Sequence, residues 1–307
     1  PITSLEIASV RLKMIIDAHQ HVFWHKKNDA DLVADLDAQG IDKAWLLTWE
    51  IPPTEDAIHY VPAFNPLHMR PDGTHPGLPF ADAYAAARKY PERFILGYCP
   101  DPNIEQAPQW FENAVKMHGV RICGEWKYRM LVDDPRNIEL FRKAGELNCP
   151  VVLHFDAPYI MGKESGRMEY FRLWYGGTMD NLESVLKACP QTTFLGHGPG
   201  FWREISGDAA SNPDIYPKGP VAPGGKVTQL LEKFDNLYCD LSAGSGCMAL
   251  TRDPEHARKF LTDFADRILF ARDYYGSELP DALKSFDLPA DVQEKIYFRN
   301  ALKLVPL

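Results

Sequence analysis

No apolar run in the 307-residue sequence reaches the roughly 18 residues that a membrane-spanning helix needs. Residues 1–13 also lack the continuous apolar stretch and the small-residue cleavage site of a secretory signal peptide. Met14 directly precedes the first strand-like segment and is a candidate for the true start of the protein. We therefore expect a cytoplasmic protein with no membrane partner, in which residues 1–13 form an N-terminal tail.

Paired cysteines are missing as well. The six cysteines are widely spaced and form no CxxC or similar motif. Most of them fall in or beside apolar runs, where a free thiol behaves as a small core residue. The sequence therefore predicts reduced, buried thiols rather than a disulfide framework or a zinc–thiolate site.

Basic residues are fewer than acidic residues, so the net charge is −9 and the isoelectric point is about 5.6. This balance disfavours nucleic acid or an anionic membrane as the main partner and leaves a small-molecule substrate as the expected one. Apolar residues make up 45% of the chain and charged residues 24%, which is typical of a globular protein. No low-complexity or linker-like segment divides the chain, so we expect residues 14–307 to form one domain.

What the sequence does contain is an alternation of short aliphatic or β-branched runs with longer amphipathic stretches, which is typical of βα units on a parallel sheet. The predicted strands are residues 14–19, 43–48, 93–98, 119–124, 150–155, 192–196, 236–241 and 267–271. Helices are predicted between them, for example at 31–39, where Gly40 ends the helix. This pattern predicts an α/β fold, a single (β/α)₈ TIM barrel.

Three predicted connections are much longer than the two to six residues that are typical of such units. They are residues 49–79, 156–179 and 198–226, and each follows the carboxyl end of a predicted strand. Barrel enzymes place their active sites at that end of the barrel. The three loops are rich in proline, glycine and aromatic residues, so we expect them to form the ordered walls of a pocket.

Histidines stand where the predicted strands end. His19 and His21 are two residues apart in an extended segment, so both imidazoles can reach one metal ion. His154 lies near the end of the fifth predicted strand, His197 directly follows the sixth, and Asp273 follows the eighth. Taken singly, His154 suits a core histidine, His197 a loop histidine and Asp273 a helix cap. Because a barrel brings its strand ends together, the joint pattern predicts a metal centre.

The same motifs carry a resemblance to a known family. DAHQH at residues 17–21, the histidine of the fifth strand, GHG at 196–198 and the aspartate of the eighth strand resemble the amidohydrolase superfamily. More narrowly, the chain is similar to the type 2, amidohydrolase-related family, which includes aminocarboxymuconate semialdehyde decarboxylase and a pyrone dicarboxylate lactonase. The resemblance runs from about residue 14 to the end, and KIYFRNALKL at 295–304 is similar to the family's closing helix.

This resemblance implies that His19, His21, His154 and Asp273 bind one divalent metal ion, with zinc as the first expectation and manganese as the second. It implies that His197 is an acid/base that orients water or substrate, or a ligand of a second ion. Asp273, in contact with metal and water together, can accept the proton of the water. His197 and Asp273 are therefore the predicted catalytic residues. The family also admits a homo-oligomer, although no segment of this sequence marks an interface.

The fourth predicted strand leads into Glu125 and Lys127, which again are two residues apart. In some members of the superfamily a carboxylate on this strand bridges two metal ions, so the resemblance implies Glu125 as a further ligand or bridge. The alternatives are an ion pair of Glu125 with Lys127 at the surface, or Lys127 as a clamp for a substrate carboxylate. The sequence does not decide between them.

A basic side chain beside a metal suits an anionic substrate, and a guanidinium can grip a carboxylate with two hydrogen bonds. The candidates for substrate binding are residues near the strand ends, namely His25, Lys127, Arg129, Tyr159 and Arg272.

The expected activity is metal-dependent hydrolysis of a lactone, ester or amide in a small, carboxylate-bearing substrate by a metal-activated water. The alternative is metal-dependent, non-oxidative decarboxylation of an unsaturated or aromatic carboxylic acid. Both activities use the same ligands, so the motifs do not choose between them. A decarboxylase is expected to show a basic residue on the departing carboxylate, for which Arg129 and Arg272 are the candidates.

Overall fold

Short parallel strands form the centre of the computed structural model, which describes residues 12–55, 57 and 59–307. They form a three-stranded group in the order β1-β2-β5 and a five-stranded group in the order β12-β11-β10-β7-β6. The bounds are β1 Ile16–Gln20, β2 Lys43–Leu46, β5 Phe94–Leu96, β6 Cys123–Trp126, β7 Val151–His154, β10 Phe194–His197, β11 Leu237–Asp240 and β12 Ile268–Leu269. All but the last two residues of the predicted tail, 1–13, lie outside the described residues.

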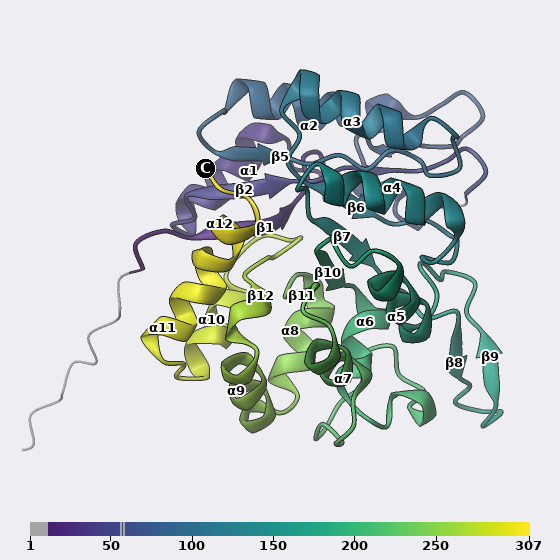
Figure 1. Ribbon diagram of the computed structural model, residues 1–307, viewed down its shortest axis with the longest axis vertical. Helices are drawn as coiled ribbons and strands as arrows, with labels where there is room; N and C mark the ends of the chain where they lie inside the picture. Colours follow the sequence, from purple (N-terminus) through teal and green to yellow (C-terminus); the bar gives the residue numbers. More distant parts are fainter. Residues whose placement is uncertain (1–11, 56, 58) are drawn as a thin grey trace, which may run out of the picture.

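Backbone hydrogen bonds join the two groups of strands at both edges. Beside β5 and β6, the amide of Tyr98 donates to the carbonyl of Ile122 at 2.9 Å. Beside β12 and β1, the amide of Ala18 donates to the carbonyl of Phe270, also at 2.9 Å. The strands therefore close into a ring, and the predicted (β/α)₈ barrel is confirmed (Figure 1).

Helices surround the strands in Figure 1. Those between the strands are α1 Asp29–Ala38, α2 Phe80–Lys89, α3 Ala107–His118, α4 Pro135–Glu146, α5 Met179–Ala188, α7 Lys226–Lys233, α8 Ala243–Thr251 and α9 Pro254–Asp263. After β12 come α10 Glu278–Ser285, α11 Ala290–Glu294, a π-helical segment Lys295–Arg299 and α12 Asn300–Leu304. Local sequence sets several ends: Asn28 and Asp31 form a capping box before α1, and Gly119, with φ 72°, ends α3.

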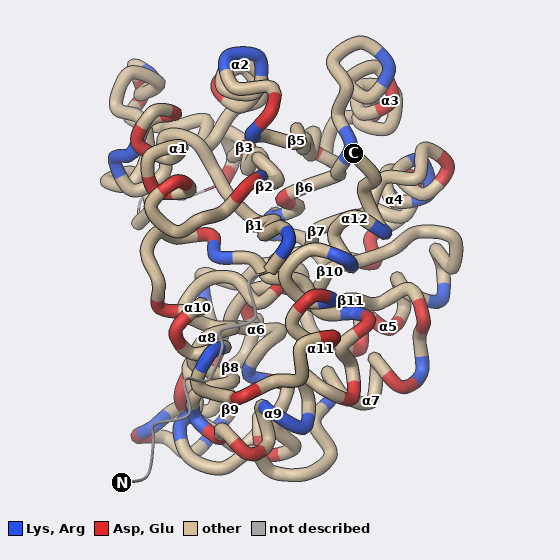
Figure 2. The backbone as a smooth tube through the Cα atoms, turned by 90° about the vertical axis from the view of Figure 1, so that its left-hand side faces the viewer, with Lys and Arg blue, Asp and Glu red and all other residues tan. Residues whose placement is uncertain are grey.

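The core lies between the strands and these helices. Every residue of β7 and β10 is buried, as expected for parallel strands that are covered on both faces. Lysine and arginine alternate with aspartate and glutamate along the outer helices (Figure 2). All six cysteines are free thiols, and five of them are buried. Among the described residues, no helix is both long and apolar enough to cross a membrane.

All eight predicted strands differ from the observed strands in one or both bounds, most of them by one or two residues and the fourth by more. The fourth was expected at 119–124, but Gly119 ends helix α3 and the strand β6 begins at Cys123. The eighth was expected at 267–271, but residues 265–267 form a 3₁₀ turn and β12 is short. The shift in β6 matters for the site, because it places Glu125 inside a barrel strand rather than in the loop after it.

The three long connections are ordered above the carboxyl ends of the strands. Residues 49–79 contain the antiparallel pair β3 (Trp49–Glu50) and β4 (Gly77–Leu78). Residues 156–179 contain the hairpin of β8 (Tyr159–Met161) and β9 (Met168–Tyr170). Residues 198–226 contain the short helix α6 (Pro199–Trp202) and two 3₁₀ turns. Side chains from all three segments line the cavity described below, as the sequence predicted.

Candidate metal centre

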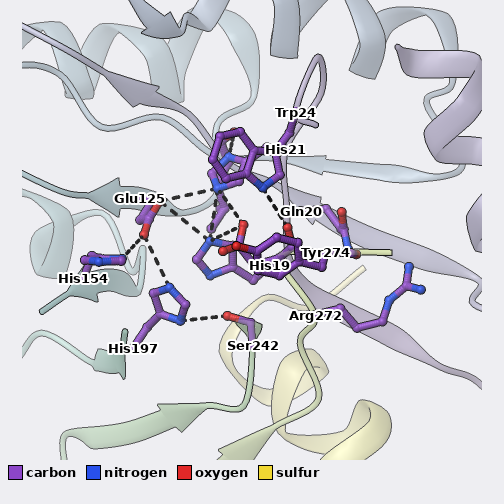
Figure 3. Close-up of polar contacts among 12 residues, drawn as sticks. His19, Gln20, His21, Trp24, Glu125, His154, His197, Ser242, Arg272 and Tyr274 are labelled. Carbon is purple, nitrogen blue, oxygen red and sulfur yellow. Dashed lines mark hydrogen bonds and ion pairs between the residues drawn. The ribbon is translucent and has the colours of Figure 1, made fainter. Parts of the chain in front are cut away.

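Imidazoles and carboxylates from five strand ends meet at the mouth of the barrel (Figure 3). His19 and His21 come from β1 and its end, Glu125 from β6, His154 from β7, His197 from β10, and Asp273 from the segment after β12. All six are at most 8% exposed. A cluster of this composition and burial, at this end of a barrel, is a candidate for metal binding.

The hydrogen bonds of His19 and His21 fix their tautomers. His19 Nδ1 donates to Asp240 Oδ2 at 2.6 Å, and His21 Nδ1 donates to the carbonyl of Leu47 at 2.9 Å. Since both partners can only accept, the proton of each neutral ring sits on Nδ1 and the lone pair on Nε2. The two Nε2 atoms lie 3.2 Å apart. Two lone pairs that face each other at this distance require a positive charge between or beside them.

Two carboxylates complete this group. Glu125 Oε2 lies 3.8 Å from His19 Nε2 and 3.4 Å from His21 Nε2. Asp273 Oδ1 lies 3.9 Å and 3.5 Å from the same two nitrogens. A metal with bonds of about 2.1 Å separates its ligands by about 3.4 Å in tetrahedral geometry. Asp273 Oδ1 is also buried without a hydrogen-bond partner among the described residues. The spacing and the unpartnered oxygen both fit a bound cation.

The other oxygen of Glu125 faces a second pair of histidines. Glu125 Oε1 lies 2.8 Å from His154 Nδ1 and 3.6 Å from His197 Nε2. His197 Nδ1 lies 2.8 Å from the hydroxyl of Ser242, while its Nε2 is buried with no partner in the described part of the chain. Glu125 therefore presents one oxygen to His19 and His21 and the other to His154 and His197.

The distances group these donor atoms differently from the predicted ligand set. The sequence grouped His154 with His19, His21 and Asp273 around one ion. Among the described residues, three groups place their donor atoms within 4.8 Å of one another: His19, His197 and Asp273; His19, His21 and Glu125; and Glu125, His154 and His197. His154 occurs only with Glu125 and His197 in these groups, because Glu125 lies between it and the pair on β1.

The ionisation of the cluster follows from burial and from its neighbours. Burial lowers the pKa of His19, but Asp240, Glu125 and Asp273 raise it further, so its pKa lies well above the usual value. Burial raises the pKa of Glu125, yet Lys127 and the surrounding histidines hold it well below its ordinary range. The space between these side chains therefore favours a bound positive charge, as is expected of a metal site.

His197 differs from the sequence-based expectation, which assumed that its imidazole titrates near neutral pH without tuning. Burial, with smaller contributions from His19 and His154, lowers the pKa of His197 to about 4. Its ring is therefore neutral at neutral pH, with Nε2 directed at the cluster. Of the alternatives for Glu125 and Lys127, an ion pair at the surface is wrong, because the two residues are 2% and 5% exposed.

Residues behind the cluster hold the ligands in place. Asp240 is fully buried, and its second oxygen accepts from the amide of Ser242 at 2.7 Å. Asp273 has a left-handed backbone, with φ 57°. Its amide donates to the carbonyl of His19 at 2.8 Å, and its own carbonyl accepts from Trp24 Nε1 at 3.0 Å. A strained non-glycine residue held by several hydrogen bonds is typical of a functional site.

A cavity of about 400 Å³ opens above the cluster, within the usual range for a small-molecule site. Its lining comprises Trp24, Tyr60, Lys127, His154, Asp156, Phe171, Leu173, His197, Pro199, Ile215, Tyr216, Ala243, Gly244, Ser245, Asp273, Tyr274 and Glu278. Aromatic and aliphatic residues make up most of this lining.

Of the five predicted substrate-binding residues, Lys127 is the one that lines this cavity. His25 stacks on Trp24 and Tyr274, which do line it. Arg129 lies over the ring of Tyr175 and donates to the carbonyl of Arg172. Tyr159 is exposed on the β8–β9 hairpin.

Arg272 is buried in ion pairs with Asp17 and Asp35, behind the site (Figure 3 shows its side chain directed away from the cluster). Its guanidinium is therefore engaged within the protein, and a substrate contact of Arg272 is not supported by its position.

Sequence reasoning missed two residues at the site. Asp156 Oδ2 accepts from His154 Nε2 at 2.9 Å and lines the cavity. Its spacing of two from His154 is the same signal that singled out His19 and His21. Tyr60 also lines the cavity. It lies within a long loop, and no local pattern pointed to it.

The comparisons with known proteins agree with this geometry. A sequence model of the amidohydrolase family, Amidohydro_2, matches residues 16–307. Among curated proteins, no sequence matches the chain. A TIM-barrel protein from Bordetella bronchiseptica superposes with a TM-score of 0.61 at 17% identity, over 95% of this chain and 98% of the other.

Two further solved structures carry functional names. A protein from Acinetobacter baumannii, named a probable 2-pyrone-4,6-dicarboxylic acid hydrolase, has a TM-score of 0.58 at 13% identity, over 94% of this chain and 98% of its own. A dihydroxybenzoic acid decarboxylase from Polaromonas, solved with manganese and 2-nitroresorcinol, has a TM-score of 0.56 at 17% identity, over 95% and 96%. At these identities the likeness shows a shared fold, while the family match covers nearly the whole chain. The chain therefore belongs to the amidohydrolase family.

Proposed function

We propose that this metal-dependent amidohydrolase-family enzyme is a hydrolase that holds two divalent ions and cleaves a lactone, ester or amide in a small substrate. The observation that carries the proposal is the position of Glu125, whose two oxygens face two separate pairs of histidines. One ion would be held by His19, His21, Glu125 and Asp273, and the other by Glu125, His154 and His197. Mixed imidazole and carboxylate ligands suit zinc or manganese.

When bound, such ions lower the pKa of water and polarise the oxygen of the scissile group. The chain itself supplies the proton acceptor. Asp273 Oδ1 has no other partner in the described part of the chain, and the backbone around it is fixed by His19 and Trp24. Its carboxylate takes the proton of the attacking water and then delivers it to the leaving group.

His197 is assigned here as a ligand. Its neutral ring, the hydrogen bond of Nδ1 to Ser242 and its unpartnered Nε2 support this role. The acid/base role that the sequence predicted for His197 is the competing assignment. The two are separable, because the removal of a ligand changes the metal content and the removal of an acid/base does not.

The metal content of purified variants tests the proposal. The wild type should bind about two ions per chain, and both Glu125→Gln and His197→Asn should bind about one, because a bridge needs an anionic carboxylate and a ligand needs its lone pair. Glu169→Gln, on the exposed strand β9, is the matched control and should keep two. A single anomalous peak in wild-type crystals grown in excess metal would refute the two-ion centre. If His197→Asn binds as many ions as the wild type and its kcat falls by roughly two to four orders of magnitude, His197 acts as an acid/base and not as a ligand.

Decarboxylation of an aromatic carboxylic acid is the second candidate. The aromatic lining of the cavity favours it, since Tyr60, Phe171 and Tyr216 offer flat apolar surface to a ring. Turnover of a panel of lactones, esters and amides against a panel of aromatic acids, with detection of CO₂, separates the two. Release of CO₂ from the acids without hydrolysis in the first panel would overturn our first choice.

A further inference from the structure

Lys127 sits in an aromatic cage at the edge of the cavity. It directly follows β6 and is 5% exposed. Its ammonium nitrogen lies 3.9 Å from the ring centroid of Trp49, 4.6 Å from that of Tyr60 and 5.3 Å from that of Tyr175. These rings belong to the long loops after β2 and β7, so tertiary structure builds the cage from three separate parts of the chain.

This ammonium makes no close ion pair in the described part of the chain, although Glu125 and Asp156 attract it from farther away. No carboxylate oxygen of residues 12–55, 57 and 59–307 lies within 4.0 Å of it, and no hydrogen bond from its Nζ is formed there. Arg272 is just as buried, at 4% exposed, but is paired with both Asp17 and Asp35. A buried charge without a close counterion is unfavourable, and cation–π contacts offset only part of that cost.

The unpaired charge faces the space where a substrate would bind. Lys127 lines the same cavity as His154, His197 and Asp273. Four carboxylates surround the centre, those of Glu125, Asp156, Asp240 and Asp273. Two divalent ions would balance their charge, which leaves Lys127 and Glu278 as the other charged side chains that line the cavity.

We infer that Lys127 is the binding position for a carboxylate of the substrate, which is a small, flat molecule that carries an acid group beside the bond that reacts. The aromatic cage holds the ammonium in place, and the apolar wall formed by Phe171, Leu173 and Ile215 accommodates the body of the molecule. This inference rests on the proposed function, because it names the substrate class of that site.

Binding of benzoate and of benzamide to the metal-loaded protein, followed by calorimetry, tests the inference. The wild type should bind benzoate and bind benzamide much more weakly, because the amide has the same shape but no charge. Lys127→Met removes the charge at similar length and should weaken benzoate binding at least tenfold. Lys27→Met is the matched control, since Lys27 lies 4.6 Å from the ring of Tyr275 but does not line the cavity, and it should leave benzoate binding unchanged.

Lys127→Gln serves as a second variant if Lys127→Met does not fold. Equal benzoate binding by the wild type and a folded Lys127 variant would overturn the inference. So would wild-type protein that binds benzamide as tightly as benzoate, or that does not bind benzoate. Metal analysis of the protein used in the titration distinguishes the failure of one proposal from the failure of the other. Lys127-dependent benzoate binding by a protein that takes up only one ion would support the carboxylate site and contradict the two-ion centre.

Discussion

Asp240 supports the proposed metal centre without being one of its proposed ligands. Its Oδ2 accepts from Nδ1 of His19 at 2.6 Å, and its Oδ1 lies 3.8 Å from Nδ1 of His197. One buried carboxylate thus holds the ring of His19 directly and lies near the ring of His197. Burial raises the pKa of Asp240, but electrostatic interactions with His19 and His197 and two hydrogen bonds bring this pKa below its ordinary value, so Asp240 is ionised.

We expect Asp240→Asn to lower metal affinity by about 10- to 100-fold, because a neutral amide holds the His19 ring less firmly and makes its Nε2 a weaker donor. Competition with a chelator of known affinity measures this change. Asp235→Asn, at an exposed position on the same segment, is the control and should leave the affinity unchanged. An unchanged affinity in Asp240→Asn would show that Leu47, Glu125 and the backbone suffice to orient the ligands.

At the scale of elements, a buried ion-pair network ties β1, α1 and the segment after β12 together. Asp17 Oδ2 accepts from Arg272 Nε at 2.7 Å, and Asp17 Oδ1 accepts from the amide of Arg272 at 2.9 Å. Asp35 Oδ2, on α1, lies 2.8 Å from Arg272 Nη2. Since Asp273 directly follows Arg272, and His19 follows Asp17 by two residues, this network fixes the spacing of two proposed metal ligands.

We expect Arg272→Met to destabilise the protein by about 3–5 kcal/mol, because it leaves the carboxylates of Asp17 and Asp35 buried without a counterion. Adding Asp17→Asn should recover part of the loss, so that the two effects are not additive. Urea unfolding of the single and double variants measures both. Lys233→Met breaks an exposed pair with Glu183 and should cost under about 1 kcal/mol. A loss from Arg272→Met as small as that of the control would contradict a structural role for the network.

At the scale of the whole molecule, the metal centre and the hydrophobic core are separate layers of the barrel. The core lies between strands and helices and is built from apolar residues such as Leu153, Leu195 and Leu237, all fully buried. The proposed ligands lie above it, at the ends of the strands. Removal of metal should therefore leave the fold intact while it removes the stabilisation that a bound ion provides.

We expect the chelated protein to keep its far-ultraviolet circular dichroism and to lose several degrees in Tm. An ion present at a thousand times its Kd stabilises the folded state by about 4 kcal/mol. Zinc or manganese should restore Tm in a concentration-dependent way, whereas magnesium, which prefers oxygen ligands, should not. A Tm that is independent of chelator and of added metal would contradict a resident metal ion in this protein.

Local sequence was sufficient for the barrel and for most residues of the centre. Alternation of apolar runs with amphipathic stretches depends on a few neighbouring residues, so the order of strands and helices could be predicted. The bounds were wrong where local signals compete, as at Gly119, which ends α3 where a strand was expected to start. The spacing of His19 and His21, and the strand ends before His197 and Asp273, likewise pointed to the site without any tertiary information.

Which donors face each other was decided only by the tertiary structure, because it depends on distances between side chains that are far apart in the sequence. The spacing of Glu125 and Lys127 in the sequence also suits a surface ion pair. In the closed barrel, however, Glu125 faces four histidines, and the long loops enclose Lys127 in aromatic rings. Arg272 stands beside a proposed ligand in sequence, but the packing of α1 against β1 pairs it with Asp35 instead of the cavity. Sequence thus determined which chemical groups reach the mouth of the barrel, and long-range packing determined the partner of each.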